Sequence, residues 1–153
     1  MNRHTKLLAV LAGPILLCLS APVRSQPPAA PEKPYTPPVR VATDWMGRTL
    51  MVVGDERRAV PIWIADLEAD RIRLALAGQP APRPLTHDLM LNVLTELGWR
   101  VAEAQVSKFE ENTLFGTLVL TDGKERKEID ARASDAIALG VRARAPIVVA
   151  ESV

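Results

Sequence analysis

Two short stretches of the 153-residue chain hold most of the side chains that could do chemistry: residues 83–88 (RPLTHD) and residues 130–135 (DARASD). Each has the composition of a helix start, where free backbone N–H groups and the helix dipole favour an anion. The arginines could hold a phosphate group with two parallel hydrogen bonds. The candidate substrate-binding residues are Arg83, Thr86, Arg132 and Ser134.

The acidic and histidine side chains of the same stretches could activate water. Carboxylate oxygens are the ligands that Mg²⁺ or Mn²⁺ prefers, and a histidine can act as general acid or base near neutral pH. Together these groups would form a site for phosphodiester hydrolysis. The candidate catalytic residues are His87, Asp88, Asp130 and Asp135, and the three aspartates are also the candidate metal ligands.

These residues also have a purely structural explanation. Thr86 and Ser134 are preferred N-cap residues, and an aspartate in the first turn of a helix stabilises it by about 0.3–1 kcal/mol. Asp88 and Asp135 could pair with the nearby arginines. On this interpretation the domain is a non-catalytic binding or assembly module. A third interpretation is that the helix starts bind a small phosphorylated metabolite or a nucleotide.

Strands and turns are expected on both sides of the first stretch. Runs at 49–54 and 59–64 predict a hairpin with Pro61 at a sheet edge, and Trp63 is expected in the core. After the second helix, runs at 99–109, 113–120 and 124–131 predict three strands, with Asp122-Gly123 as a hairpin turn. A short buried strand is expected to close the domain at 146–150.

Three helices are expected, capped by Asp66, Thr86 and Ser134. The first should bury a stripe made of Leu67, Ile72 and Leu76. In the second, Leu89, Val93 and Leu97 recur on one face. The element order β-β-α-α-β-β-β-α-β predicts an α+β fold of two layers, in which a mixed β-sheet is covered by about three helices. Similar apolar offsets after Ile64 and Ile129 suggest a possible internal duplication.

The first 25 residues have the pattern of a signal peptide: basic Arg3 and Lys6, an apolar run at 7–19, and small residues before a cleavage point after Ser25. The apolar run is too short to span a bilayer, so we expect no stable membrane insertion. Cys18 lies inside this run after a large leucine, which disfavours lipidation. We therefore expect a periplasmic or secreted protein whose exported form has no cysteine.

Residues 26–38 (QPPAAPEKPYTPP) predict an extended proline-rich linker, and the folded domain is expected at 39–153. Removal of residues 1–25 takes away three basic side chains and no acidic one, which changes the net charge from +1 to −2. A broad basic surface for nucleic acid is therefore excluded, and any phosphate recognition must be local.

The motifs in combination resemble the bifunctional nuclease domain family. The strings that carry the resemblance are VPIWI (60–64), RPLTHDL (83–89), IDARASDAIAL (129–139) and APIVV (145–149), together with Glu68. One departure is Ala133, where the family usually has proline between arginine and serine; the export signal is another.

What the resemblance implies is an α+β domain that often self-associates, with nuclease activity on DNA and RNA. It therefore predicts a nucleic acid substrate and a homo-oligomer. It also adds Glu68 as a possible metal ligand, because Glu68 matches a motif position of the family.

Overall fold

The computed structural model describes residues 37–153. The signal peptide expected at 1–25, with Cys18, lies outside the described residues, as does the expected linker except for its last two prolines. Within residues 37–153, no helix has both the length and the apolar composition needed to cross a membrane.

Seven strands and three helices make up the described part of the chain, and they confirm the α+β class. In chain order they are β1 (Val39–Thr43), β2 (Thr49–Gly54), β3 (Ala59–Trp63), α1 (Asp66–Leu76), α2 (Thr86–Glu96), β4 (Arg100–Glu110), β5 (Thr113–Thr121), β6 (Arg126–Arg132), α3 (Ala133–Ala143) and β7 (Ile147–Val149).

The strands form two sheets, where the sequence predicted one. The first is antiparallel with the order β1-β2-β3, and the second has the order β6-β5-β4-β7 and is mixed because β7 runs parallel to β4. The predicted β2–β3 hairpin is confirmed, with Pro61 on the edge strand, where a missing N–H is tolerated. Strand β1 was not predicted; it pairs with β2 from Val39↔Val53 to Thr43↔Thr49.

Helix α3 packs against the four-stranded sheet and is buried along most of its length. Two glycines allow the close approach. A Cβ on Gly140 would lie 2.7 Å from the Cβ of Ala104, and a Cβ on Gly116 of β5 would lie 2.8 Å from the Cα of Ala133. The first turn of α3 is therefore pressed onto the backbone of β5, which fixes where its side chains point.

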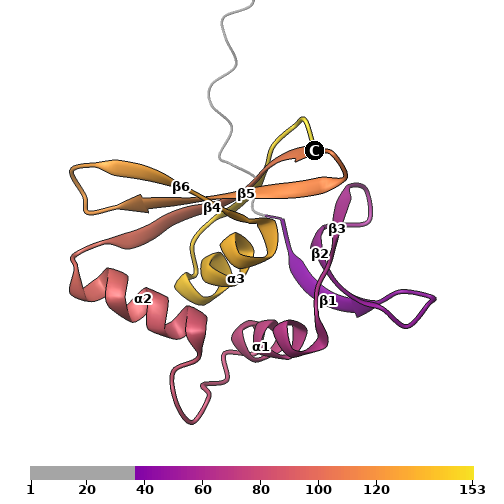
Figure 1. Cartoon of the computed structure of the whole chain (residues 1–153), viewed down its shortest axis with the longest axis horizontal. Coiled ribbons are helices and arrows are strands. Elements are labelled where there is room, and N and C mark those ends of the chain that lie inside the picture. Colours follow the sequence, from indigo (N-terminus) through magenta and orange to yellow (C-terminus); the bar gives the residue numbers. More distant parts are fainter. Residues whose placement is uncertain (1–36) are drawn as a thin grey trace, which may run out of the picture. The chain divides into compact units, whose positions relative to one another are not determined.

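Helices α1 and α2 both contact α3, which lies between them and the four-stranded sheet (Figure 1). The predicted buried stripe of α1 is wrong for two of its members, because Leu67 and Leu76 are exposed and only Ile72 is buried. Five residues turn an α-helix by about 140° beyond a full turn, so Leu67 cannot share a face with Ile72. The buried face consists of Ala69 and Ile72.

Helix α2 has apolar side chains on two sides. Leu91 and Leu94 pack on the core on the same side as the buried His87. The face that the sequence singled out is exposed instead; its members are Leu89, Val93 and Leu97, joined by Met90.

Candidate functional site

The three helices begin earlier than the sequence predicted. Asp66, Thr86 and Ser134 are wrong as N-caps, because they already lie inside the first turn and no side-chain cap hydrogen bond is present at any of the three starts. The N-cap positions, each with an extended backbone, are occupied by Ala65, Leu85 and Arg132.

This shift puts a carboxylate at the third position of every helix: Glu68 in α1, Asp88 in α2 and Asp135 in α3. An acidic residue there can reach back to the N-cap backbone. Only Asp88 does so, and its Oδ2 accepts a hydrogen bond from the N–H of Leu85 at 2.9 Å. Glu68 and Asp135 contact the side chain of Arg132 instead.

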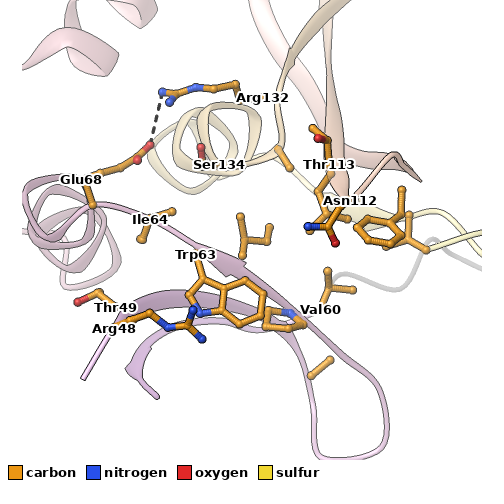
Figure 2. A pocket seen from close by; sticks show the side chains of 18 of the residues that line it. Arg48, Thr49, Val60, Trp63, Ile64, Glu68, Asn112, Thr113, Arg132 and Ser134 are labelled. Atoms are coloured by element: carbon orange, nitrogen blue, oxygen red, sulfur yellow. Dashed lines mark ion pairs between the residues drawn. The ribbon is translucent and has the colours of Figure 1, made fainter. Parts of the chain in front are cut away.

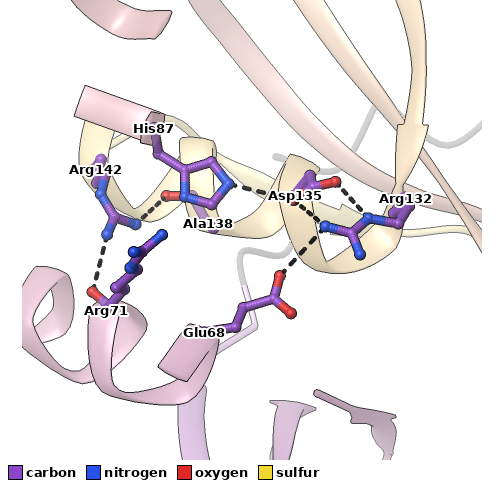
Figure 3. Close-up of polar contacts among 7 residues, drawn as sticks. All are labelled: Glu68, Arg71, His87, Arg132, Asp135, Ala138 and Arg142. Carbon is purple, nitrogen blue, oxygen red and sulfur yellow. Dashed lines mark hydrogen bonds and ion pairs between the residues drawn. The ribbon is translucent and has the colours of Figure 1, made fainter. Parts of the chain in front are cut away.

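Figure 3 shows the resulting helix-start network, which we define as Glu68, His87, Arg132 and Asp135. Arg132 donates two hydrogen bonds to Asp135, from Nε to Oδ2 at 2.6 Å and from Nη2 to Oδ1 at 2.9 Å. His87 Nε2 lies 3.3 Å from Asp135 Oδ1, and Arg132 Nη2 lies 3.8 Å from Glu68 Oε1. The first turns of α1 and α3 therefore meet at the Arg132 guanidinium, and α2 joins them through the contact of His87 with Asp135.

The charges of this network stabilise one another. The hydrogen bonds from Arg132 hold the pKa of Asp135 below its ordinary value of 3.8, although partial burial raises it, and the contact with His87 lowers it further. The same pairing raises the pKa of Arg132. An ionised carboxylate only accepts hydrogen bonds, so this contact requires the hydrogen to be on His87 Nε2, which then donates a hydrogen bond to Asp135 Oδ1.

Two polar atoms of the network are buried without a hydrogen-bond partner among the described residues: Glu68 Oε1 and His87 Nδ1. The 3.8 Å separation between Glu68 and Arg132 is an ion pair that is too long for a hydrogen bond. Buried polar atoms are nearly always satisfied, so an exception requires an explanation. A nitrogen or oxygen atom that accepts no hydrogen bond has a lone pair available for a ligand.

A groove of about 1170 Å³ begins at the network and runs between β3 and the β4–β5 hairpin. Its lining includes Arg48, Trp63, Glu68, Asn112, Arg132 and Ser134 (Figure 2). Glu68 and Arg132 belong to both the network and the groove, whereas His87 and Asp135 do not line the groove. A ligand in the groove would therefore meet the guanidinium and one carboxylate first.

The sequence profile of the bifunctional nuclease domain matches residues 49–153, more than half of the chain. The chain belongs to this family. The matched range runs from β2 to the last residue, so it includes the whole network and every residue that lines the groove except Arg48. The resemblance noted in the sequence is confirmed.

The chain is similar to proteins from two strains of Mycobacterium tuberculosis, each described only as an uncharacterized protein. Both are 36% identical to this chain over 96 residues. The aligned stretch covers 63% of this chain and 57% of each relative. The roles of individual residues in this chain must therefore be argued from its own geometry.

The other predicted site residues of the bifunctional nuclease domain are scattered. Arg83 and Thr86 are exposed, and Ser134 is buried where it lines the groove. Asp130 is exposed on β6, paired through its backbone with Thr117. The two predicted stretches thus meet where His87 contacts Asp135, which is paired with Arg132.

The carboxylates of the predicted metal ligands Asp88, Asp130 and Asp135 do not come together around one point. Asp88 is bound to Arg142 and the Leu85 backbone, Asp135 is bound to Arg132, and Asp130 lies on another element. Nowhere in residues 37–153 do three acidic, histidine or cysteine side chains gather as a metal site would require. Mg²⁺ or Mn²⁺ dependence, with Glu68 as a further ligand, stays a prediction.

Arg142 is a structural residue of the site that the sequence did not reveal. Its side chain is 7% exposed, and its Nε bonds Asp88 Oδ1 at 3.0 Å. Its other two nitrogens donate to the carbonyl oxygens of Ala138 and Arg71 at 3.2 and 2.9 Å. Arg142 thereby ties α1, α2 and α3 together beneath the network. Its position seven residues after Asp135, on the same helix face, was the available signal.

Trp63 was expected in the core, and this is wrong: it is 55% exposed. The alternation of β3 explains the difference, because Ile62 points into the core and its neighbour Trp63 must point the other way. The ring lies in the groove instead (Figure 2).

Proposed function

We propose that this bifunctional nuclease domain hydrolyses phosphodiester bonds of DNA or RNA at the helix-start network. One observation carries the proposal: at the end of a groove, Arg132 contacts the first turns of α1 and α3, and the first turn of α2 joins them through His87 and Asp135. Helix starts and a guanidinium group both favour a phosphate. Membership of a nuclease-related family supports the same chemistry.

In this proposal Arg132 binds the phosphate. Its side chain is 71% exposed even though it is paired with Asp135, so the guanidinium remains open to a ligand. Asp135 fixes its orientation with two hydrogen bonds, and His87 fixes Asp135. His87 and Asp135 are thus positioning residues, which hold the cation where charge develops on the phosphate. The catalytic roles predicted for Asp88 and Asp130 stay predictions.

Glu68 is the proposed general base. Its side chain lines the groove and is 18% exposed, and its buried Oε1 has no hydrogen-bond partner among residues 37–153. Water attacks phosphorus and gives its proton to Glu68, while the bond from phosphorus to the leaving oxygen breaks and that oxygen takes a proton from solvent. Mg²⁺ or Mn²⁺ would add charge stabilisation, while Arg132 binds the phosphate and Glu68 accepts the proton of the attacking water.

We also propose that the chain is exported to the periplasm or the medium, as residues 1–25 predict. Nucleic acid outside the cytoplasm would then be its substrate. Detection of the protein in the periplasmic or culture fraction, with an N-terminus near Gln26, tests this part separately from the activity.

The experiment is a nuclease assay on the purified protein with labelled DNA and RNA, in Mg²⁺, in Mn²⁺ and in EDTA. Glu68→Gln should lower the cleavage rate by about 100-fold, the usual effect of losing a general base. Asp135→Ala and His87→Ala should lower it as well, since Arg132 loses its support. Glu128→Gln, an exposed β6 position outside the groove, is the matched control and should cleave normally.

A non-catalytic binding or assembly module is the second candidate. It is favoured by one observation: two of the three helix-start carboxylates are each held by an arginine, Asp88 by Arg142 and Asp135 by Arg132. It predicts no hydrolysis in any metal condition, together with a stable oligomer. Cleavage by the wild type that Glu68→Gln abolishes, with the variant still folded, would eliminate it.

A further inference from the structure

Trp63 occupies an unusual position for a large aromatic residue. More than half of it is exposed, and it lies in the middle of the groove between Arg48 and Val60 (Figure 2). Fully burying such a ring would stabilise the fold, so leaving it open has a cost. Exposed aromatic surface inside a groove is typical of a ligand site.

The indole ring is held in place by Asp44 and Arg48, although 55% of Trp63 stays exposed. Its Nε1–H donates to Asp44 Oδ2 at 3.3 Å, and the guanidinium carbon of Arg48 lies 5.3 Å from the ring centroid. Arg48 Nε also bonds Asp44 Oδ2 at 2.8 Å. Burial raises the pKa of Asp44, but the hydrogen bonds from Arg48, Trp63 and Met46 outweigh it and lower the pKa to about 2. An ionised Asp44 therefore orients both side chains before any ligand arrives.

The remaining groove side chains suit a nucleotide. Arg48 and Arg132 are two exposed cations that line it. Two acidic side chains line it as well: Asp66, which accepts a hydrogen bond from the hydroxyl of Thr49, and Glu68, which forms an ion pair with Arg132 at 3.8 Å. Asn112, on the hairpin wall, offers an amide with both donors and an acceptor. A base needs an aromatic face and polar edges, and its phosphate needs a cation.

We infer that the groove binds single-stranded nucleic acid, with one unpaired base stacked on Trp63 and a neighbouring phosphate on Arg132. The inference deepens the proposed function and rests on it for the choice of ligand. In a duplex each base is covered by its neighbours, so a fixed indole can stack only on a base that is unpaired or flipped out. The structure thus assigns single strands as the preferred substrate.

The test measures binding in EDTA by fluorescence anisotropy, with the full chain expressed with its own leader and purified as the cell processes it. The probes are a short labelled DNA strand, its duplex with the complementary strand, and an abasic strand of the same length. The wild type should bind the single strand most tightly. Trp63→Ala should weaken that binding about tenfold without changing the affinity for the abasic strand, which keeps only the phosphates.

Two further variants keep the test decisive. Trp63→Phe retains an aromatic face and should recover most of the affinity. Trp45→Ala removes an even more exposed tryptophan outside the groove and should bind like the wild type. Thermal melting followed by circular dichroism reports whether each variant is folded.

Each outcome decides between the two proposals. If folded Trp63→Ala binds the single strand as the wild type does, or the duplex binds as tightly as the single strand, the stacking inference is overturned whatever the cleavage rate. If the wild type cleaves nothing but binds single strands through Trp63, the nuclease proposal fails and the stacking inference stands.

Discussion

At the scale of single residues, Arg132 is the group on which the site depends. It is the N-cap residue of α3, and its one guanidinium group contacts carboxylates from two helices, Asp135 of its own and Glu68 of α1. A planar guanidinium can make such contacts because its five N–H groups point in fixed directions. A lysine at this position would keep the charge and lose the geometry, so charge alone does not describe the site.

The pairing of Asp135 predicts a dependence of stability on pH. Its pKa is lower in the folded protein than its ordinary value of 3.8, so its contribution is complete above that pH and is lost as the pH falls through the folded value. Asp135→Asn should lower the free energy of unfolding by about 1 kcal/mol at pH 7. The difference from the wild type should shrink below pH 3.8.

Urea unfolding at pH 7, 5 and 3, followed by circular dichroism, measures this difference. Asp130→Asn is the control, because Asp130 is an exposed aspartate of the neighbouring strand and should unfold like the wild type at each pH. A deficit of Asp135→Asn that stays constant down to pH 3 would show that its carboxylate charge is not what stabilises the fold.

At the scale of elements, the site depends on how α3 is seated on β5. The contact is made at Gly116, where a Cβ would lie 2.8 Å from Ala133 Cα and 2.9 Å from the carbonyl oxygen of Arg132. Both neighbours are backbone atoms, so they cannot move aside as a flexible side chain can. The residues displaced by any larger side chain are the first of α3, next to the network.

Gly116→Ala should therefore damage both stability and activity. Overpacking of this kind costs about 1–3 kcal/mol, and the strain would shift Arg132 away from the groove. The measurements are urea unfolding and the cleavage rate. Thr117→Ala, one residue along on the opposite face of the same strand, should have a smaller effect on both. Equal effects of the two variants would mean that α3 does not depend on the close approach at Gly116.

Much of this arrangement could be predicted from local signals. The strings RPLTHD and DARASD located the two helix starts, and Asp122-Gly123 located the turn between β5 and β6, where Asp122 Oδ1 accepts the N–H groups of Lys124 and Glu125. The β2–β3–α1 and β5–β6–α3 segments share a hairpin-then-helix order, and the internal duplication stays a prediction.

The errors have a common cause, since they concern which neighbour a residue meets. Helical spacing alone could not show which of the two apolar faces of α2 packs on α3. The preference of Thr86 and Ser134 for N-caps was overridden by residues before them that already had extended backbones. The partner of Asp88 proved to be Arg142, 54 residues away, and no local rule reaches that far.

At the scale of the whole molecule, the described surface includes an apolar face without a partner in the structure. It lies on α2 and its C-cap residue, and consists of Leu89, Met90, Val93 and Leu97. Contiguous apolar surface of this kind often marks a contact with another protein. The homo-oligomer expected from the family resemblance stays a prediction, and this face is where we expect the copies to meet.

Introduction of a charged residue into this apolar face should therefore separate the copies. We expect the wild type to sediment as an oligomer and Leu97→Glu to shift it towards the monomer, because a carboxylate in an apolar interface would be desolvated without a partner. Leu67→Glu is the matched control: Leu67 is a leucine of α1 that is 65% exposed, against 68% for Leu97, and it lies outside this face. Sedimentation velocity distinguishes the species. A monomeric wild type would show that this face is not an interface between copies. A Leu97→Glu variant that stays associated while Leu67→Glu separates would place the interface elsewhere. Neither result would bear on the groove or the network.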